Sequence, residues 1–274
     1  MLRMFPQDMI QTHIAQYLSQ GSRGPAPRVA RWELVNAILW KLKTGCHWEY
    51  LPVKSLISSG EVTYGTVFHH FRKWVKDGSW MRAWEKLTTT YKRLLDLSTA
   101  QFDGTHSLAK RGGSAVGYQR RKRGKTTNIL LLTDRNGIVV AAGIPVAGNH
   151  HDVFEIERQM AHIFEQLKRM EIPTEGLFLN ADAGFDCQKL RQICESEGII
   201  LNVAQNKRAA KHSHDEYLFD ELMYQERFAV ERTNAWIDSF RTLAVRQDTT
   251  VESWSSWHYI AFSFWFIKHT LQKL

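Results

Sequence analysis

Three acidic residues that lie far apart in the chain have the types and positions needed to share one reaction: Asp103, Asp182 and Glu231. The two aspartates lie on or at the end of predicted strands, and Glu231 lies on a predicted late helix. A few carboxylates hold Mg²⁺ and leave water and substrate phosphates to complete its octahedron. Two such ions can activate an attacking oxygen and stabilise the leaving oxygen of a phosphodiester. The three carboxylates therefore predict metal-dependent phosphoryl transfer on nucleic acid.

Each aspartate taken alone is a weak signal. Asp103 precedes Gly104, and an Asp-Gly pair also forms ordinary turns. Asp182 closes the apolar run LFLNA, at the carboxyl end of a predicted strand, where open α/β sheets place ligands. Asp186 competes with it, but a cap for the helix that begins near Cys187 is the better interpretation of that residue. The pattern favours Asp182.

Glu231 shares one helical face with Tyr224 and Arg227, because the three are spaced three and four residues apart. In this arrangement Tyr224 could position a hydroxyl or stack near a base, and Arg227 could clamp a phosphate. An ordinary surface helix with an ion pair would have the same spacing. Asp152 and Glu155 have the spacing of an acidic N-cap and its N3 partner at the start of the next predicted helix. His150 and His151 could ligate a metal, but beside Asp152 they are better interpreted as capping or packing residues at that helix start.

The basic residues are unevenly distributed along the chain. The net charge is +8, residues 1–100 contain 14 Lys or Arg against 7 acidic residues, and residues 104–133 contain seven basic residues and no acidic one. A polyanion laid across both segments would explain this distribution, and a scattered basic surface is the alternative. The second segment is rich in glycine and predicts a loop that becomes ordered on phosphates. Its basic residues are Lys110, Arg111, Arg120, Arg121, Lys122, Arg123 and Lys125.

The first 97 residues predict a small helical domain. Apolar residues recur at helical spacing from Arg31 to Thr44, and Gly45 provides a stop. A second helix follows from about Tyr64, and Ser79 is the predicted cap of a third. The second helix has basic residues on its outward face, which resembles a helix-turn-helix module; a plain bundle that braces a catalytic domain is the alternative. These outward residues are Arg72, Lys73 and Lys76.

The periodicity changes after Ser98 and predicts an α/β domain over residues 98–274. A loose alternation in AQFDGTHSLA predicts a strand, and two β-runs joined by Asp-Arg-Asn-Gly predict a hairpin. Alternating helices and strands follow, ending in the long helix YQERFAVERTNAWIDSFRTLAV and an apolar helix. The order βββαβαβα with a mixed sheet is that of ribonuclease H-like domains. The segment 206–215 predicts an exposed loop.

The composition restricts the class of protein further. A chain of 274 residues with 43% hydrophobic residues is long enough for globular domains with a real core. No apolar run of about 18 residues predicts a membrane span, and the N-terminus lacks the apolar core of a secretory signal. Three cysteines without metal-ligand spacing fit a reducing compartment. We therefore expect a cytoplasmic protein that does not enter a membrane.

Several segments resemble the DDE transposases of bacterial insertion sequences, in the superfamily of insertion sequences four and five. The resemblance covers nearly the whole chain. VNAILWKLKTGCHWEYLP and FRKWVKDGSW are similar to the family's opening, FDGTHSLAKRGG to the segment with its first catalytic Asp, and NADAGFD to its second acidic motif. The most specific segment is YQERFAVERTNAWIDSFRTLAVR, which has the family's Tyr, then an Arg after two residues and a Glu after three more.

The resemblance implies a DNA transposase with Asp103, Asp182 and Glu231 as ligands of Mg²⁺, or of Mn²⁺ in its place. Such an enzyme hydrolyses double-stranded DNA at the terminal inverted repeats of its element and joins the freed 3′-hydroxyl to target DNA. It forms no covalent intermediate with the enzyme, so we do not interpret Tyr224 as a nucleophile. Because two element ends must be held together, we expect a homodimer on DNA, in the cytoplasm and associated with the nucleoid.

One residue departs from the family pattern. The family commonly has Lys or Arg seven residues after the Glu, and this chain has Asp238 there. The resemblance implies that a cation at this position would hold a phosphate of the transposon end, and Arg241 is the predicted substitute. Two alternatives stay open: a ribonuclease H-like nuclease without strand transfer, and a domesticated DNA-binding protein that does not cut. The second would be indicated by loss of a carboxylate, and all three are present.

Overall fold

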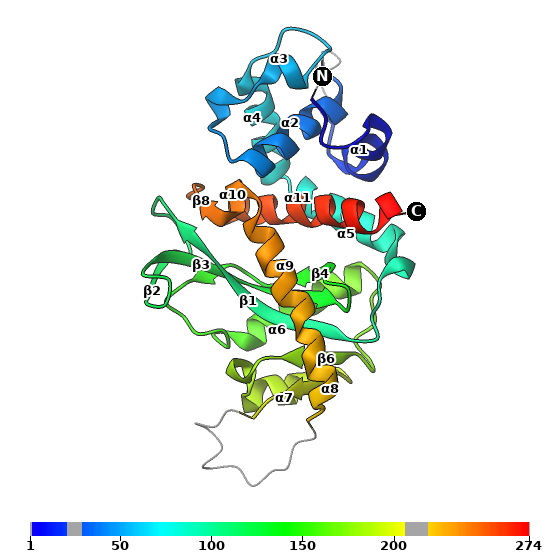
Figure 1. Ribbon diagram of the computed structural model, residues 1–274, viewed down its shortest axis with the longest axis vertical. Coiled ribbons are helices and arrows are strands. Elements are labelled where there is room, and N and C mark those ends of the chain that lie inside the picture. The colour runs from blue at the N-terminus through cyan, green and yellow to red at the C-terminus, as the bar shows by residue number, and fades with distance from the viewer. Residues whose placement is uncertain (1, 21–28, 206–218, 274) are drawn as a thin grey trace. The chain divides into compact units, whose positions relative to one another are not determined.

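The computed structural model describes residues 2–20, 29–205 and 219–273, so the loop predicted at 206–215 lies outside the described residues. The chain divides into two compact units (Figure 1). The first contains Met1–Thr90, Lys110–Ser114 and Ile237–Leu274, and the second contains Tyr91–Ala109 and Ala115–Trp236. The last helices thus pack with the N-terminal helices. Whether the chain functions as domains 1–97 and 98–274 stays a prediction.

The first unit is built around one apolar helix, α11 (Val251–His269), whose side chains are buried on nearly all sides. A helix that is apolar all round needs neighbours on several faces. Its neighbours include α2, α4, α5 and α10, and Trp84 of α5 stacks on Tyr259 with 5.4 Å between ring centroids. The other elements are α1 (Gln7–His13), η1 (Ala15–Tyr17), α2 (Arg31–Thr44), η2 (Trp48–Tyr50), α3 (Val53–Leu56), α4 (Tyr64–Lys76), α5 (Ser79–Thr90), α10 (Arg241–Ala244), β8 (Val245–Arg246) and η7 (Leu271–Lys273).

The three helices predicted in the N-terminal segment are present. Helix α2 ends where Gly45 takes the left-handed conformation with φ of 66°, which glycine adopts at little cost. Helix α4 buries Val67, Phe71 and Trp74. Helix α5 begins at Ser79 itself, and the Asp77 carboxylate, not the Ser79 hydroxyl, accepts from its first backbone N–H at 3.0 Å.

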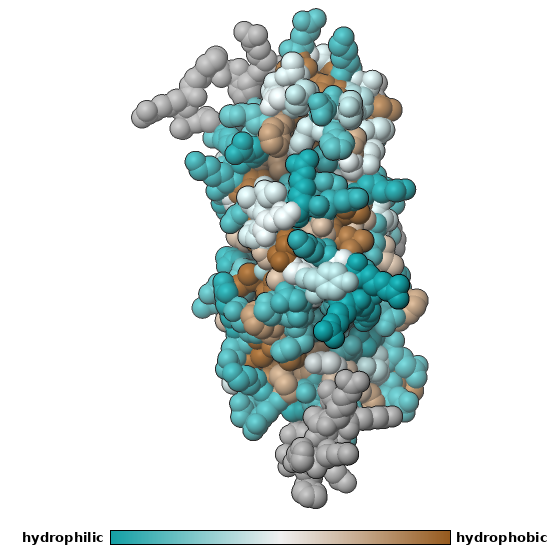
Figure 2. Space-filling model, turned by 90° about the vertical axis from the view of Figure 1, so that its left-hand side faces the viewer, coloured by the Kyte–Doolittle hydropathy of each residue, from teal (hydrophilic) through white to brown (hydrophobic). Residues whose placement is uncertain are grey.

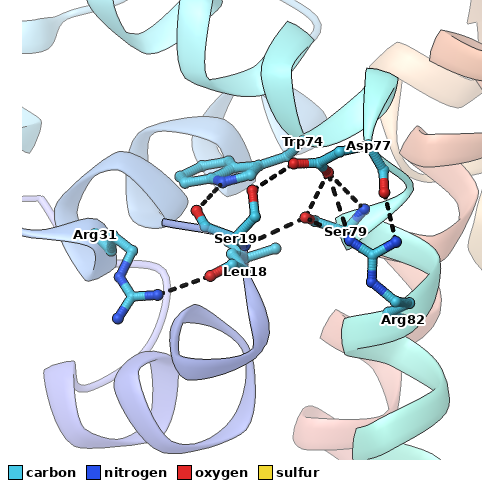
Figure 3. A network of polar contacts seen from close by, with 7 residues as sticks. All are labelled: Leu18, Ser19, Arg31, Trp74, Asp77, Ser79 and Arg82. Atoms are coloured by element: carbon cyan, nitrogen blue, oxygen red, sulfur yellow. Dashed lines mark hydrogen bonds and ion pairs between the residues drawn. The ribbon is translucent and has the colours of Figure 1, made fainter. Parts of the chain in front are cut away.

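Asp77 joins the end of α4 and the start of α5 to the segment after η1 (Figure 3). Its carboxylate accepts hydrogen bonds from the hydroxyls of Ser19 and Ser79, and Arg82 lies 3.7 Å away. The Trp74 indole donates to the Ser19 carbonyl at 3.0 Å. Burial acts to raise the pKa of Asp77, but the hydrogen bonds from Ser19 and Ser79 outweigh it and hold the pKa below its usual value.

Replacing Asp77 by Ala should lower the free energy of unfolding by about 1–3 kcal/mol at pH 7, because the donors around it lose their acceptor. A carboxylate with a lowered pKa stabilises the fold above its unfolded-state pKa and loses this effect as the pH falls through the folded-state value. The deficit should therefore shrink below pH 3.8. Urea unfolding at pH 7 and in acid measures it, with the exposed Asp8→Ala as control; equal deficits at both pH values would contradict the charge-dependent role.

The second unit contains the mixed sheet, with strands in the order β2-β3-β1-β6-β7. Strands β1 (Ala100–Ala109) and β3 (Gly124–Asp134) are antiparallel, and β1, β6 (Phe178–Ala181) and β7 (Ile200–Val203) are parallel. Along the other edge of β3 lie β2 (Gly117–Gln119), β5 (Val146–Ala147) and β4 (Val139–Ala142). The main elements follow the predicted order βββαβαβα, and β2 and β5 are short additions.

The predicted hairpin joins β3 and β4. Gly137 has φ of 83°, the Asp134 N–H donates to the Ile138 carbonyl at 2.9 Å, and the Asp134 carboxylate accepts from the Ile138 N–H at 2.7 Å. A positive φ at the last turn position is the reason that glycine is favoured there.

The remaining elements of this unit are η3 (Lys92–Leu94), α6 (Ile156–Arg169), η4 (Ala183–Phe185), α7 (Gln188–Ser196), α8 (Glu221–Tyr224), η6 (Gln225–Arg227) and α9 (Phe228–Asp238), whose end enters the first unit. The long helix predicted from Tyr224 onward is wrong in its extent, because a 3₁₀ turn precedes α9 and the helix ends at Asp238. Phe240 follows in extended conformation and is fully buried, so burial of that ring accompanies the break.

Two predicted helix caps are also wrong. At α6 the cap position is Glu155, in left-handed conformation and without a side-chain cap bond. At α7 the cap position is Cys187, and Asp186 instead pairs with Arg191 at 2.6 Å. The three cysteines are free thiols, and none of the helices that the structure describes is long and apolar enough to cross a membrane.

Candidate active site

Asp103 and Asp182 are neighbours because of the register of β1 and β6. The two parallel strands pair Phe102 with Ala181, the last pair of their ladder, and the aspartates are the next residue on each strand. Neighbouring strands lie about 4.8 Å apart, and residues level with each other in a parallel pair project to the same face. The structure thus brings two of the three predicted acidic residues together at the carboxyl end of β6.

Asp103 is largely enclosed by the residues around it. Its Oδ2 accepts a hydrogen bond from the Asn234 amide at 3.0 Å, and Nη2 of Arg227 lies 4.0 Å from its Oδ1. Burial raises the pKa of Asp103 to about 6; Arg227 and the Gly104 N–H oppose the rise, and the nearby Asp182 and Asp152 carboxylates add to it. Because the pKa of Asp103 is raised and two other carboxylates lie nearby, a bound cation would be stabilised here.

Glu231 lies on the face of α9 that contacts Asp103. It follows Arg227 by four residues and precedes Asn234 by three, so these side chains share one helical face. Both neighbours contact Asp103, whereas Glu231 itself is exposed. In sequence Glu231 thus stands between two residues that contact Asp103, and its own carboxylate is exposed.

Asp182 is held in place locally. It is the cap residue of η4, and its Oδ1 accepts from the Gly184 N–H at 2.7 Å. Asp186 is engaged by the Arg191 guanidinium through two bonds, of 2.6 and 3.1 Å. Asp186 is thus paired with a cation, whereas Asp182 accepts from a backbone N–H; the choice between them stays a prediction.

Asp152 is a residue of this site that sequence reasoning interpreted only as a helix cap. Its Oδ1 accepts from the Asn128 amide at 2.9 Å, and it contributes to the raised pKa of Asp103. A Cβ atom at Gly104 would stand 2.8 Å from Asp152 Oδ1 and 3.1 Å from Asn128 Oδ1. The glycine after Asp103 therefore makes room for a fourth carboxylate. The run GNHHD contains the signal, but only the packing of β1 against β3 brings it to Asp103.

Replacing Gly104 by Ala should destabilise the fold by about 1–3 kcal/mol, because the added methyl group forces Asp152 or Asn128 to move. The double variant Gly104→Ala/Asp152→Ala should recover most of this loss. Gly112→Ala is the matched control, since no atom stands within 4 Å of the position that its methyl group would take. Urea unfolding measures all three, and a Gly104→Ala variant as stable as the control would show that the space is not restricted.

The polar atoms around Asp103 are incompletely paired. Within the part of the chain that the structure describes, three buried atoms of this region have no hydrogen-bond partner: Asn128 Oδ1, Arg227 Nε and Asn234 Oδ1. Among the described residues, no group of three or more His, Cys, Asp or Glu side chains is arranged to hold a metal ion. The region thus has two buried amide oxygens with free lone pairs, but Glu231 is not gathered with Asp103 and Asp182 into one group of metal ligands among the described residues.

Tyr224 and Arg227 act together beside Asp103. The Arg227 guanidinium donates to the Tyr224 hydroxyl at 3.1 Å and lies 5.2 Å from the centre of its ring. Because Arg227 also approaches Asp103, the phenol fixes the arginine at the edge of the acidic group. His150 stacks on Phe154 with 3.6 Å between ring centroids, in agreement with a packing role for that residue.

The other predicted DNA-binding residues lie on two different units. In the second unit the predicted loop is a hairpin, because β2 pairs with the start of β3 and a turn joins them; its exposed basic residues are Arg120, Arg121, Lys122, Arg123 and Lys125. Figure 2, which turns the β2–β3 side toward the reader, shows hydrophilic side chains gathered there. In the first unit, Arg72, Lys73 and Lys76 lie on α4 and the exposed Arg241 begins α10; Asp238 is exposed at the end of α9.

The mixed sheet and the elements that follow it define a ribonuclease H-like domain, with the neighbouring Asp103 and Asp182 on β1 and at the end of β6. The family model of the DDE superfamily endonucleases matches residues 102–263, and that of the IS4/5-family transposases matches residues 8–84. The chain belongs to the DDE superfamily endonucleases, whose model covers more than half of it. The two matches together identify a transposase of the DDE type.

A solved transposase structure agrees with this fold, and a second is similar over most of the chain at a lower score. The piggyBac transposase, in its synaptic complex with hairpin DNA, is 11% identical with a TM-score of 0.50, over 97% of this chain and 75% of that one. The Mos1 transposase, in its paired-end complex with the left transposon end, is 15% identical with a TM-score of 0.30, over 90% of this chain and 80% of that one. No curated protein matches the sequence.

Proposed function

We propose that this transposase cuts double-stranded DNA at the terminal inverted repeats of its own element and joins the freed 3′-hydroxyl ends to target DNA. The observation that carries the proposal is the register of β1 and β6, which sets Asp103 beside Asp182, together with the face of α9 that contacts Asp103 and bears Glu231.

The donor set fits Mg²⁺, with Mn²⁺ as a substitute. Hard divalent cations take carboxylate and amide oxygens, and the region offers Asp103, Asp182 and Glu231 along with two unpaired amide oxygens, from Asn128 and Asn234. Asp103, Asp182 and Glu231 would hold a pair of such ions, which would supply activation of the water or hydroxyl nucleophile and stabilisation of the leaving 3′-oxygen. The raised pKa of Asp103 also fits, since bound cations would favour its ionised form.

The protein's own groups position the carboxylates and the substrate. Arg227 restrains Asp103 from one side and Asn234 from the other, so the carboxylate keeps one orientation. Tyr224 in turn holds the Arg227 guanidinium, which can receive a phosphate oxygen of the substrate. The exposed cations of the β2–β3 hairpin, Arg120 to Arg123 and Lys125, bind the DNA backbone without reading its sequence.

We also propose how the protein assembles on DNA and which residue replaces a missing phosphate contact. Two copies of the chain hold the two element ends, so a dimer forms on DNA in the cytoplasm, where the bacterial chromosome lies. Arg241 takes the phosphate contact that Asp238 does not provide.

Labelled element-end DNA and a target plasmid, incubated with the protein and Mg²⁺ or Mn²⁺, test the reaction. Cut ends joined covalently to the plasmid are the expected product. Cleavage without joined product would favour a nuclease that only hydrolyses, and end-specific binding without cleavage would favour a DNA-binding protein that does not cut.

A further inference from the structure

The first unit contains a cleft that the proposed chemistry does not use. It has a volume of about 920 Å³ and lies between the end of α2, η2, α4, the segment Lys110–Ser114 and the start of α11. Five basic residues line it, namely Lys41, Arg72, Lys73, Lys76 and Arg111, and we call it the cationic cleft. Arg111 and the α4 residues come from the two basic segments across which the sequence predicts that one polyanion is laid.

The charge of the cationic cleft is almost entirely positive. Among the described residues that line it, the five basic side chains and two histidines, His47 and His69, face one carboxylate, that of Asp248. Asp248 is already engaged, because it accepts a hydrogen bond from the Trp257 side chain and lies beside the Lys41 ammonium. Arg72 and Lys76 are exposed, so the remaining positive charge is available to an anion.

Backbone groups add to the positive electrostatic potential of the cationic cleft. Helix α11 begins at Val251, and its cap residue Thr250 accepts from the Ser253 N–H at 3.3 Å; Thr249, Thr250 and Ser253 line the cleft. The start of a long helix carries partial positive charge and free N–H groups. The segment with Arg111 is tied to the same region, because the Ser114 N–H donates to the Thr249 carbonyl at 3.1 Å.

Aromatic rings form the other part of the wall. Trp48 and Phe68 are half-buried and lie 5.1 Å apart by ring centroids, and Arg72 lies 5.7 Å from the centre of the Phe68 ring. Behind them Phe71 stacks on Trp257 at 4.3 Å, and the Lys41 ammonium lies 5.6 Å from the Trp48 ring. Phosphate-binding cations beside partly open rings are the combination that binds single strands, because every base has a face that can stack.

We propose that the cationic cleft binds a short single-stranded stretch of DNA, with phosphates against Arg72, Lys73, Lys76 and Arg111 and a base against Trp48 and Phe68. A cavity of this size suits a ligand of one or a few nucleotides, whereas a double helix would meet only the rim. The inference rests on the proposed function to the extent that a strand cut at an element end then separates from its complement.

Binding of a labelled 12-nucleotide single strand, followed by fluorescence anisotropy in EDTA over a range of salt concentrations, tests the cleft without requiring catalysis. The variant Arg72→Ala/Lys73→Ala/Lys76→Ala should bind on the order of 30-fold more weakly. Its slope of log affinity against log salt should be less steep by about 2, since each phosphate contact to a single strand contributes about 0.7.

The matched control is Lys54→Ala/Lys86→Ala/Lys268→Ala, which removes the same charge from exposed positions on α3, α5 and α11 outside the cleft. It should change the affinity by less than about threefold, as expected for charges that make no phosphate contact. Equal losses in the two triple variants would overturn the proposal, because the effect would then come from net charge alone.

The aromatic part is tested with Trp48→Leu. Its affinity for the single strand should fall about 10-fold, and its affinity for a strand of abasic sites should not change, since a stacked base contributes about 1–3 kcal/mol. If duplex DNA of the same sequence binds more tightly than the single strand and Trp48→Leu leaves both unchanged, the cleft contacts a duplex backbone and the proposal is wrong.

The outcome is independent of the proposed reaction. An Asp182→Asn variant should bind the single strand like the wild type, because Asp182 lies in the second unit, outside the cleft. If the protein binds the single strand but neither cuts nor joins DNA, the proposed function is wrong and the proposed role of the cationic cleft still holds. If the α4 triple variant cuts and joins DNA normally and its affinity for the single strand is unchanged, the proposal that the cationic cleft binds a single strand is wrong and the proposed function still holds.

Discussion

Glu231→Gln is expected to lower the rate of strand cleavage by at least about 1000-fold, which corresponds to about 4 kcal/mol of transition-state stabilisation. A neutral amide has nearly the shape of the carboxylate but ligates Mg²⁺ poorly. Binding of element ends should remain within about twofold of the wild type. Stability should also be unchanged, because Glu231 is exposed and substitutions at such positions seldom alter the fold.

Excision and integration of the gene's native flanking DNA, carried on a plasmid, measure this effect in cells, and cleavage of labelled ends measures it in solution. Glu221→Gln is the matched control, because this glutamate is also exposed and lies on the short helix α8 just before α9. Movement of the element with both variants would remove Glu231 from the site. If the element moves with none of the three proteins, the wild type included, Asp238 would be the first residue to replace by Lys.

The sequence predicted most of the fold because each element has a local signal. Val67, Phe71 and Trp74 repeat at helical spacing and are buried on α4, and the turn before Gly137 forms the predicted hairpin. The errors lie where tertiary contacts decide. Phe240 is buried and interrupts a pattern that looks helical through Val245, and the 3₁₀ turn before α9 has no signal in the spacing of its apolar residues.

The candidate site could be predicted in part for the same reason. Asp182 follows a short apolar strand, and strand ends are readable in a sequence, but the register that sets it beside Asp103 arises from pairing between segments about 80 residues apart. Asn128 on β3, Asp152 in the turn before α6 and Asn234 on α9 also contact the site. Their spacing along the chain does not indicate that they meet. The cationic cleft likewise joins α4 to Arg111 and the start of α11.

Replacing Asp103 by Asn should abolish cleavage and at the same time stabilise the fold at neutral pH. Burial raises the pKa of Asp103 to about 6, so the fold disfavours its ionised form. A group with a raised pKa contributes stability that is fully present below its unfolded-state pKa and is lost as the pH rises through the folded-state value. At pH 7.5 the wild type has therefore lost up to about 3 kcal/mol that it keeps near pH 4.

Asparagine has no charge to bury and can still accept from Asn234, so the variant should unfold at a higher urea concentration than the wild type at pH 7.5 and at nearly the same concentration near pH 4. Wild-type cleavage should fall in acid, because the protonated Asp103 no longer offers a charged ligand. Since bound cations favour the ionised form, the midpoint of this fall should lie below the metal-free pKa of about 6. Addition of Mg²⁺ should stabilise the wild type and not the variant, since bound cations compensate the buried charge.

Asp134→Asn is the control that shows whether replacing any buried aspartate by Asn changes the stability in the same way. Burial likewise raises the pKa of Asp134 to about 6, but its carboxylate accepts from the backbone N–H groups of Asp96, Asn136 and Ile138. An amide cannot accept all three bonds, because its nitrogen is a donor, so this variant should lose about 1–3 kcal/mol at pH 7.5. If Asp103→Asn also destabilised the fold at pH 7.5, Asp103 would be a structural acceptor like Asp134, and its burial would no longer be evidence for a metal site. Stabilisation at Asp103 together with destabilisation at Asp134 would mean that the fold tolerates an unfavourable charge on β1 because the chemistry requires it there.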